Sequence, residues 1–447
     1  MESYLGNQNT LKSIFRLAIP SMVGQLISVL YNIVDRIYVG NLPNIGEIAL
    51  IGVGVCSPIV TLITSFAFLV GLGGAPMFSI ALGEKDNDKA KKILSNALLM
   101  LIFYLFSEPI LFLFGASEVS IEYALSYLRI YLIGTFFSLL TLGLNQYLTA
   151  QGESTKAMMT TIIGCVLNIG LDPLFMYFFH LGVKGAALAT VISQFISFIF
   201  VIFILLKKTP IKLSFGGYDI KIVLKIIKLG ISPFIIMATD SIILILLNNS
   251  LKLYGKDKGD FYIEIATIVQ AFETLATGPL LGISSGTQPI LGYNYGAKNK
   301  KLIIKAEKQL LIFALIFTSS FFILSFFIAK PFSIMFIGIG KDHINYEIVN
   351  EASKIIFYYM LGIIPLSFQY VFVDGLTGLG QAKYSIWLSL IRKVVIFIPS
   401  IYLLPLVTNS VESAFFAEPI CDIISAIVTS ICYLIFLPKI LKKIETN

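Results

Sequence analysis

The most restrictive feature of this sequence is a series of apolar runs, each close to the roughly 20 residues that a helix needs to cross a bilayer. The chain of 447 residues is 57% apolar and only 13% charged, whereas soluble domains carry roughly 25% charged residues. These runs predict an all-α polytopic membrane protein with twelve transmembrane helices. The predicted spans are residues 14–40, 46–80, 93–114, 121–148, 157–180, 184–206, 229–253, 262–292, 303–328, 352–379, 384–406 and 411–437.

Lysine and arginine are distributed unequally between the two sides of the predicted spans. One side carries 22 of these residues and the other side carries 7. Because cytoplasmic loops are enriched in basic residues, we predict a plasma-membrane protein with both termini in the cytoplasm. The formal charge of +7 is therefore interpreted as a topology signal, and we expect no nucleic-acid partner because no clustered basic face is present.

The two halves of the chain repeat one another. Three pairs of stretches are similar: GAPMFSIALGEK (74–85) and TQPILGYNYGAK (287–298), LTAQGES (148–154) and LTGLGQA (376–382), and VKGAALA (183–189) and VESAFFA (411–417). The offset is 213 at the first pair and 228 at the other two, so one insertion separates them. We predict an N-lobe (1–206), a basic cytoplasmic linker (207–228) and a C-lobe (229–447), related by a pseudo-two-fold axis along the membrane normal, with a substrate site between the lobes.

Polar residues inside two spans of the N-lobe are the first functional candidates. Asn168 and Asp172 are one helical turn apart and share a helix face, and a carboxylate inside a bilayer is a functional hypothesis by default. Asp35 belongs to a polar stripe in the first span, where Pro20 is expected to kink the helix. Both carboxylates are predicted in the outer half, where a hydrated pocket would suit a proton or a sodium ion. The alternative is that they simply pair with Arg36 or Arg129.

The C-lobe offers several further acidic residues inside spans. Asp240, Glu273 and Asp374 are candidates for lining a cavity that takes a cationic substrate, as are Glu418 and Asp422. The eleventh span also holds Arg392 and Lys393, so mutual ion pairing is an equally valid interpretation of these residues.

Other chemistries are poorly supported by the sequence. GISSG (282–286) fits G-x-S-x-G formally, but it lies within an apolar span, where the strand-to-helix turn of a hydrolase has no place. No P-loop is visible. Cys56, Cys165, Cys421 and Cys432 lack metal-ligand spacing and are expected to be packing residues. We therefore expect no enzyme, no catalytic residue and no cofactor other than a coupling ion.

The sequence resembles the multidrug and toxic compound extrusion (MATE) transporters over essentially its whole length. The similar stretches are LAIPSMVGQLISVLYNIVDRIYVG (17–40), NIGLDPLF (168–175), GVKGAALATVIS (182–193) and QPILGYNYGAKN (288–299). The resemblance implies two six-helix lobes around a central cleft and export of organic cations driven by an ion gradient. It also implies a cation site, which takes sodium in some members, at Asp35, Asn168, Asp172 and Thr190. Asp374 does not lie at the acidic position of the tenth helix that one branch of the family carries.

The primary hypothesis is thus an antiporter that exports small cationic, amphipathic compounds in exchange for protons or sodium ions and functions as a monomer in the lipid bilayer. One alternative is a flippase of the wider superfamily for a lipid-linked saccharide or precursor, which would need a strongly cationic cleft for pyrophosphate. Another is a membrane receptor or scaffold that transports nothing, although it would not require duplicated lobes with a paired polar site.

Overall fold

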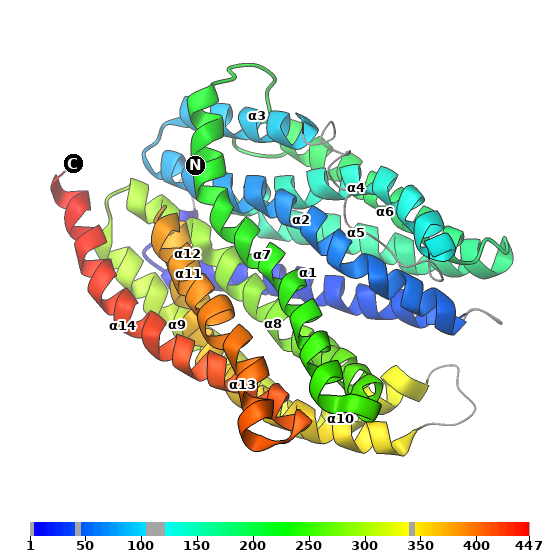
Figure 1. The fold of residues 1–447 in the computed structure, drawn as a ribbon. Coiled ribbons are helices and arrows are strands. Elements are labelled where there is room, and N and C mark those ends of the chain that lie inside the picture. Colours follow the sequence, from blue (N-terminus) through cyan, green and yellow to red (C-terminus); the bar gives the residue numbers. More distant parts are fainter. Residues whose placement is uncertain (1–3, 41–45, 104–120, 339–344, 447) are drawn as a thin grey trace.

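The computed structural model describes residues 4–40, 46–103, 121–338 and 345–446, which are almost entirely helical (Figure 1). The helices of the first half are α1 (Thr10–Gly40), α2 (Gly46–Gly83), α3 (Asn87–Phe103), α4 (Ile121–Ala150), α5 (Ser154–Pro173) and α6 (Val183–Lys207). Those of the second half are α7 (Ile220–Gly255), α8 (Gly259–Gly296), α9 (Lys300–Gly338), α10 (Tyr346–Tyr359), α11 (Ile363–Gly378), α12 (Ala382–Leu390), α13 (Ile398–Thr408) and α14 (Ala417–Thr446).

Short stretches of tighter or wider helix connect several of these elements. The 3₁₀ segments are η1 (Tyr4–Gly6), η4 (Lys256–Lys258), η5 (Met360–Gly362) and η7 (Val411–Phe416). Two segments are π-helical, η3 (Leu174–Phe178) after α5 and η6 (Ile391–Phe397) between α12 and α13. π-helical turns are rare and are found mostly at functional sites, and these two follow Asp172 and contain Arg392.

Within the described residues, nine helical stretches are long and apolar enough to cross a membrane. They cover ten of the twelve predicted spans, because one stretch of 64 residues, Pro233–Gly296, contains two of them. The other two predicted spans, 93–114 and 121–148, correspond to α3 and α4, and residues 104–120 lie outside the described residues. The basic linker is shorter than its predicted limits, since α7 begins at Ile220 and residues 220–228 are helical.

The two halves form two helical bundles, and the first helix of each half also packs against the other half. Figure 1 shows α2 to α6 on one side and α9 to α14 on the other, with α1, α7 and α8 between them. The most extensive contacts between the halves join α2 to α7 and α1 to α8. Leu17 and Val29 of α1 belong to the apolar core of the second half, while Ile226 of α7 belongs to that of the first half. This reciprocal packing is what a repeat related by a two-fold axis requires.

The contact between α1 and α8 depends on glycines. A Cβ atom on Gly282 would lie 2.7 Å from the Cα of Met22, and one on Gly286 would overlap the Ser21 side chain. Both contacts fall directly after Pro20, where α1 lacks a backbone N–H donor, although α1 is continuous through this residue. These α8 glycines therefore permit close helix approach, and GISSG lies inside a helix rather than at a strand-to-helix turn.

The loops rich in lysine and both ends of the described chain lie at the same end of the molecule (Figure 1). We call this the basic end. It includes the α2–α3 and α8–α9 connections, around Lys85 and Lys298, where the backbone turns with positive φ at both lysines. The repeat seen in the sequence thus extends to the conformation of these two turns.

Candidate functional site

The predicted polar pair on α5 is a buried cluster. The side chains of Asn168, Asp172 and Thr190 are each at most 2% exposed. Asn168 Nδ2 donates to Asp172 Oδ1 at 3.2 Å and to Thr190 Oγ1 on α6, also at 3.2 Å. The one-turn spacing of Asn168 and Asp172 therefore places both side chains where the sequence predicts, and the amide connects α5 to α6.

Asp35 joins this cluster from α1. Its side chain is 8% exposed, and its carboxylate is close enough to Asp172 for the two negative charges to repel each other. A hydrogen bond of 2.8 Å from the Tyr177 hydroxyl in η3 to the Tyr38 carbonyl ties the same part of α1 to α5. The side chains of Arg36 and Arg129 lie outside the described part of the structure, so the alternative that these arginines neutralise the carboxylates stays untested.

The end of α5 is shaped by Pro173. Proline has no N–H to donate, and the helix continues beyond it as the π-helix η3. Asp172 therefore lies directly before the change of helix type, and Met176 within η3 is buried. The aspartate is held at the junction of two helical geometries, at the end of the molecule opposite the basic end.

The donor set of this cluster suits a small hard cation or a proton. Asp172 Oδ2 and Asn168 Oδ1 are buried and have no hydrogen-bond partner within the described residues. Carboxylate, amide and hydroxyl oxygens are the ligands that hard cations prefer, and two like-charged carboxylates close together also favour binding of a proton. The described residues contain no group of three or more His, Cys, Asp or Glu that could hold a metal ion, but a sodium site needs no such group.

A cavity of about 500 Å³ opens directly against the cluster. Asn168 and Thr190 line it, together with Asn145, Ser193 and Gln194 from the first half. Its lining is dominated by neutral hydroxyl and amide groups. Met237 and Thr274 of the second half complete the wall, so this cavity lies between the halves, as a transporter site between repeats would.

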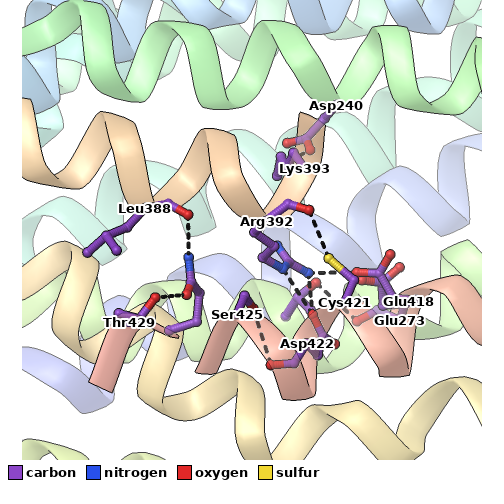
Figure 2. A network of polar contacts seen from close by, with 12 residues as sticks. Asp240, Glu273, Leu388, Arg392, Lys393, Glu418, Cys421, Asp422, Ser425 and Thr429 are labelled. Carbon is purple, nitrogen blue, oxygen red and sulfur yellow. Dashed lines mark hydrogen bonds and ion pairs between the residues drawn. The ribbon is translucent and has the colours of Figure 1, made fainter. Parts of the chain in front are cut away.

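A second cavity of about 460 Å³ lies mainly in the second half and shares four lining residues with the first, so the two are adjacent. The shared residues are Val29, Thr61, Met237 and Thr274. Unlike the first cavity, the second is lined by charged side chains, and Figure 2 shows all of them. The charged lining residues are Asp240, Glu273, Arg392, Lys393 and Glu418.

Arg392 is the centre of a buried ion-pair network (Figure 2). Its Nη2 atom lies 2.6 Å from Glu418 Oε1 and 2.8 Å from Asp422 Oδ1, and its Nε donates to Asp422 Oδ1 at 3.0 Å. The Cys421 thiol donates to the Arg392 carbonyl at 2.9 Å. Mutual pairing, one of the two interpretations left open by the sequence, is therefore confirmed for Arg392.

Lys393, the next residue of the π-helix η6, forms a separate ion pair with Asp240 on α7. Asp240 is half-buried and lines the cavity. Glu273 lies near the Arg392 network, and no ion pair joins it to a cation within the described residues. Four carboxylates, those of Asp240, Glu273, Glu418 and Asp422, thus share this region with two cations.

Asp374, also predicted to line the substrate cavity, is not among the lining residues of either cavity. Its Oδ2 atom accepts a hydrogen bond of 2.5 Å from Ser284 on α8. Asp374 itself lies four residues before the end of α11 at Gly378, near the basic end. The structure therefore brings Asp240 and Glu273 together at one cavity and places Asp374 elsewhere. Sequence reasoning did not single out Glu307, a buried acidic residue of α9, although it lies inside the predicted span 303–328, because the lysines around it are typical of a span end at the membrane surface.

The family model MatE matches this chain twice, at residues 20–174 and 258–403. The two matched segments fall in the two predicted lobes. The chain therefore belongs to the MatE family and is a multi-pass membrane protein.

Curated relatives cover most of the chain. The multidrug export protein MepA of Staphylococcus haemolyticus is 29% identical over 327 residues, which cover 70% of this chain and 71% of the relative. The multidrug export protein MepA of Staphylococcus saprophyticus is 25% identical over 440 residues, covering 95% and 94%.

Solved structures share the fold. A MATE protein in complex with MaL6 has a TM-score of 0.90 at 22% identity and covers 99% of this chain and 100% of that one. The outward-facing conformation of a multidrug resistance MATE family transporter of the MOP superfamily also has a TM-score of 0.90 at 22% identity, with 99% of each chain covered. A MOP superfamily transporter from Pyrococcus furiosus, whose binding pocket of reverse polarity suggests a different function, has a TM-score of 0.89 at 21% identity, with 98% of this chain and 99% of that one covered. The fold with two lobes is therefore confirmed, while the last likeness shows that the fold alone does not fix the substrate.

Proposed function

We propose that this protein is a secondary active multidrug antiporter of the plasma membrane, which exports cationic, amphipathic compounds in exchange for protons or sodium ions. The observation that carries the proposal is the buried cluster in which Asn168 contacts both Asp172 and Thr190, at the wall of a cavity between the two halves. Its MepA relatives are multidrug export proteins. The basic end, with both termini, is the cytoplasmic end.

In this proposal, Asp172 and Asp35 bind the coupling ion, and Asn168 and Thr190 provide neutral ligands. Asn168 and Thr190 also line the first cavity, so an ion bound to them changes the surface that a substrate meets. If ion binding weakens substrate binding, linkage requires that substrate binding weakens ion binding by the same factor. This reciprocity is what exchange transport needs.

The second cavity supports a cationic substrate. Glu273 and Asp240 face it from α8 and α7, and the carboxylates of this region outnumber its cations. A cation that enters is attracted by the unbalanced negative charge, and the apolar lining from Leu244 and Leu247 accommodates its hydrophobic part. A flippase for a pyrophosphate-linked lipid would require the opposite charge balance.

The test is efflux of a fluorescent organic cation from proteoliposomes with an imposed proton or sodium gradient. The variants are Asp172→Asn and Asp35→Asn, and the matched control is Asp257→Asn in the exposed segment η4. We expect gradient-driven efflux from the wild type and the control, and none from the two variants at equal reconstitution.

The outcomes separate the alternatives. The gradient that drives efflux identifies the coupling ion. Normal efflux by both variants would refute the ion site, whereas a wild type that moves no cation but scrambles a lipid-linked saccharide would refute the antiporter and support a flippase. A wild type that binds organic cations and transports nothing would support a receptor.

A further inference from the structure

Glu307 is a buried acidic residue that the proposed transport cycle does not yet use. It lies on α9, seven residues after the helix begins at Lys300, and is 4% exposed. Within the described residues neither carboxylate oxygen pairs with a cation, and the neighbouring donor is the Tyr433 hydroxyl of α14. An ionised carboxylate in this position would be buried without a counter-ion, which is costly enough that such groups take up a proton instead.

The polar groups near Glu307 on α14, α11 and α8 are acidic or neutral. From α14 comes the Tyr433 hydroxyl, which is itself buried, and from α11 comes the carboxylate of Asp374. α8 contributes Ser284 and Gln288, the polar neighbours of Asp374. The lysines that flank Glu307 on its own helix, such as Lys305, which donates to the Gln8 carbonyl at 3.0 Å, face outward.

Glycine at position 375 makes room for the carboxyl group. A Cβ atom on Gly375 would lie 3.1 Å from the Glu307 Cδ atom, closer than real Cβ contacts normally are. Gly375 is adjacent to Asp374, so α11 brings the backbone of Asp374 next to the Glu307 carboxyl group, while the Asp374 side chain accepts from Ser284 of α8.

The repeat shows that the fold itself does not require this acidic pair. At the offsets of 213 and 228, Glu307 corresponds to Leu94 and Gly375 to Tyr147, both fully buried in the apolar core of the first half. Asp374 corresponds to Gln146, a neutral amide. The second half therefore has two carboxyl groups and a glycine where the first half has apolar packing and an amide.

We propose that Glu307 and Asp374 form a second proton-binding site, in the half of the C-lobe nearest the basic end. The site holds a proton because an ionised Glu307 would be buried without a counter-ion, and the negative charge of Asp374 adds to that cost. This inference rests on the proposed function only for the side of the membrane with which the pair exchanges protons. With the basic end in the cytoplasm, the Asp172 cluster near the opposite end takes up an ion from outside, and the Glu307–Asp374 pair exchanges protons with the cytoplasm.

The test begins with infrared spectroscopy of the purified protein in D2O, which detects the C=O band of a protonated carboxyl group without any transport. The wild type should show a band that disappears as the pD is raised and that is lost or shifted in Glu307→Gln and in Asp374→Asn. The control is Glu347→Gln, an exposed residue in the first turn of α10, which should keep the band. A titrating band that is the same in all four proteins would overturn the proposal.

Transport gives the second measurement. In proteoliposomes, Glu307→Gln should flatten the dependence of efflux on the pH at the cytoplasmic face while leaving its dependence on the pH at the outer face. An unchanged profile at the cytoplasmic face, in a variant whose infrared band is lost, would show a structural carboxyl group and overturn the exchange role. Because the infrared result does not require efflux, a failure of the antiport proposal would be recognised separately.

Discussion

Arg392 and Lys393 are consecutive residues of one π-helix, yet their ion pairs differ in burial. Glu418 and Asp422, which contact Arg392, have side chains that are 11% and 4% exposed, whereas Asp240, which pairs with Lys393, is 44% exposed. A buried carboxylate that loses its partner keeps its desolvation cost, whereas an exposed one is hydrated. Loss of Arg392 is therefore expected to lower stability more than loss of Lys393.

The first prediction at the residue scale concerns stability. Arg392→Met should lower the free energy of unfolding by about 3–5 kcal/mol, because it leaves Glu418 and Asp422 buried without a cation. Thermal unfolding of the detergent-solubilised protein measures this change. Lys393→Met is the matched comparison and should cost no more than about 1 kcal/mol. Equal losses in the two variants would contradict the distinction.

The second prediction at this scale concerns substrate affinity. The ammonium group of Lys393 pairs with the Asp240 carboxylate, so an organic cation that enters the cavity competes with Lys393 for this carboxylate. Lys393→Gln should tighten binding of a monovalent organic cation about two- to fivefold, the value of an exposed ion pair. Equilibrium fluorescence titration measures the Kd.

Lys393→Arg, which keeps the charge, is the control for that titration, and Lys252→Gln, at an exposed position near the end of α7, tests for a general effect of net charge. Weaker binding by Lys393→Gln would show that the lysine helps to hold the substrate rather than competing with it.

At the scale of whole elements, the pairing of α1 with α8 gives the third prediction. A methyl group on Gly282 would lie 2.6 Å from the Ser21 carbonyl oxygen, which is backbone and cannot move independently. Gly282→Ala should therefore lower the free energy of unfolding by about 1–3 kcal/mol, the usual destabilisation from overpacking. Gly170→Ala on α5 is the control, since a Cβ there meets nothing within 4 Å, and it should stabilise the helix by about 0.5–1 kcal/mol. Denaturation of both variants in the same detergent tests the prediction, and a stable Gly282→Ala would show that α1 can shift away from α8.

The helices also show which features can be predicted from the sequence alone. Apolar runs of the right length predicted the spans, and the spacing of Asn168 and Asp172 predicted their shared face, because both signals are local to one helix. The π-helix η6 has no comparable local signal, so the separation of Arg392 from Lys393 into two ion pairs was not foreseen. Glu307 was missed because it lies among lysines near the start of the predicted span 303–328, a position where an acidic residue is expected at the membrane surface, whereas in the structure it is buried. Whether a charged residue is buried depends on the helix packed against it, here through Gly375.

At the scale of the whole molecule, the two halves meet closely near the basic end. A Cβ atom on Gly292 of α8 would lie 3.1 Å from the Ser79 Cβ of α2, and Gly83 and Gly296 allow the same two helices to pack backbone against backbone. The first cavity lies between the halves beside the Asp172 cluster, and the second cavity adjoins it in the second half. The two halves are thus in close contact near the basic end. Alternating access would then require α2 and α8 to separate here.

The fourth prediction tests that separation. Cysteines at positions 79 and 292 would have Cβ atoms near the 3.5–4.5 Å of a disulfide. In a chain whose own four cysteines are replaced by alanine, the double variant Ser79→Cys/Gly292→Cys should lose transport on oxidation and regain it on reduction. The control pair, Gly24→Cys/Met158→Cys, also has a short Cβ separation, 3.8 Å, but joins α1 to α5 within the first half. Oxidation should leave that control active, because its bond does not bridge α2 and α8. Full transport by an oxidised Ser79→Cys/Gly292→Cys protein, with the cross-link verified by mass spectrometry, would mean that the two halves do not need to part at the basic end, and the route of the substrate would then have to avoid this contact.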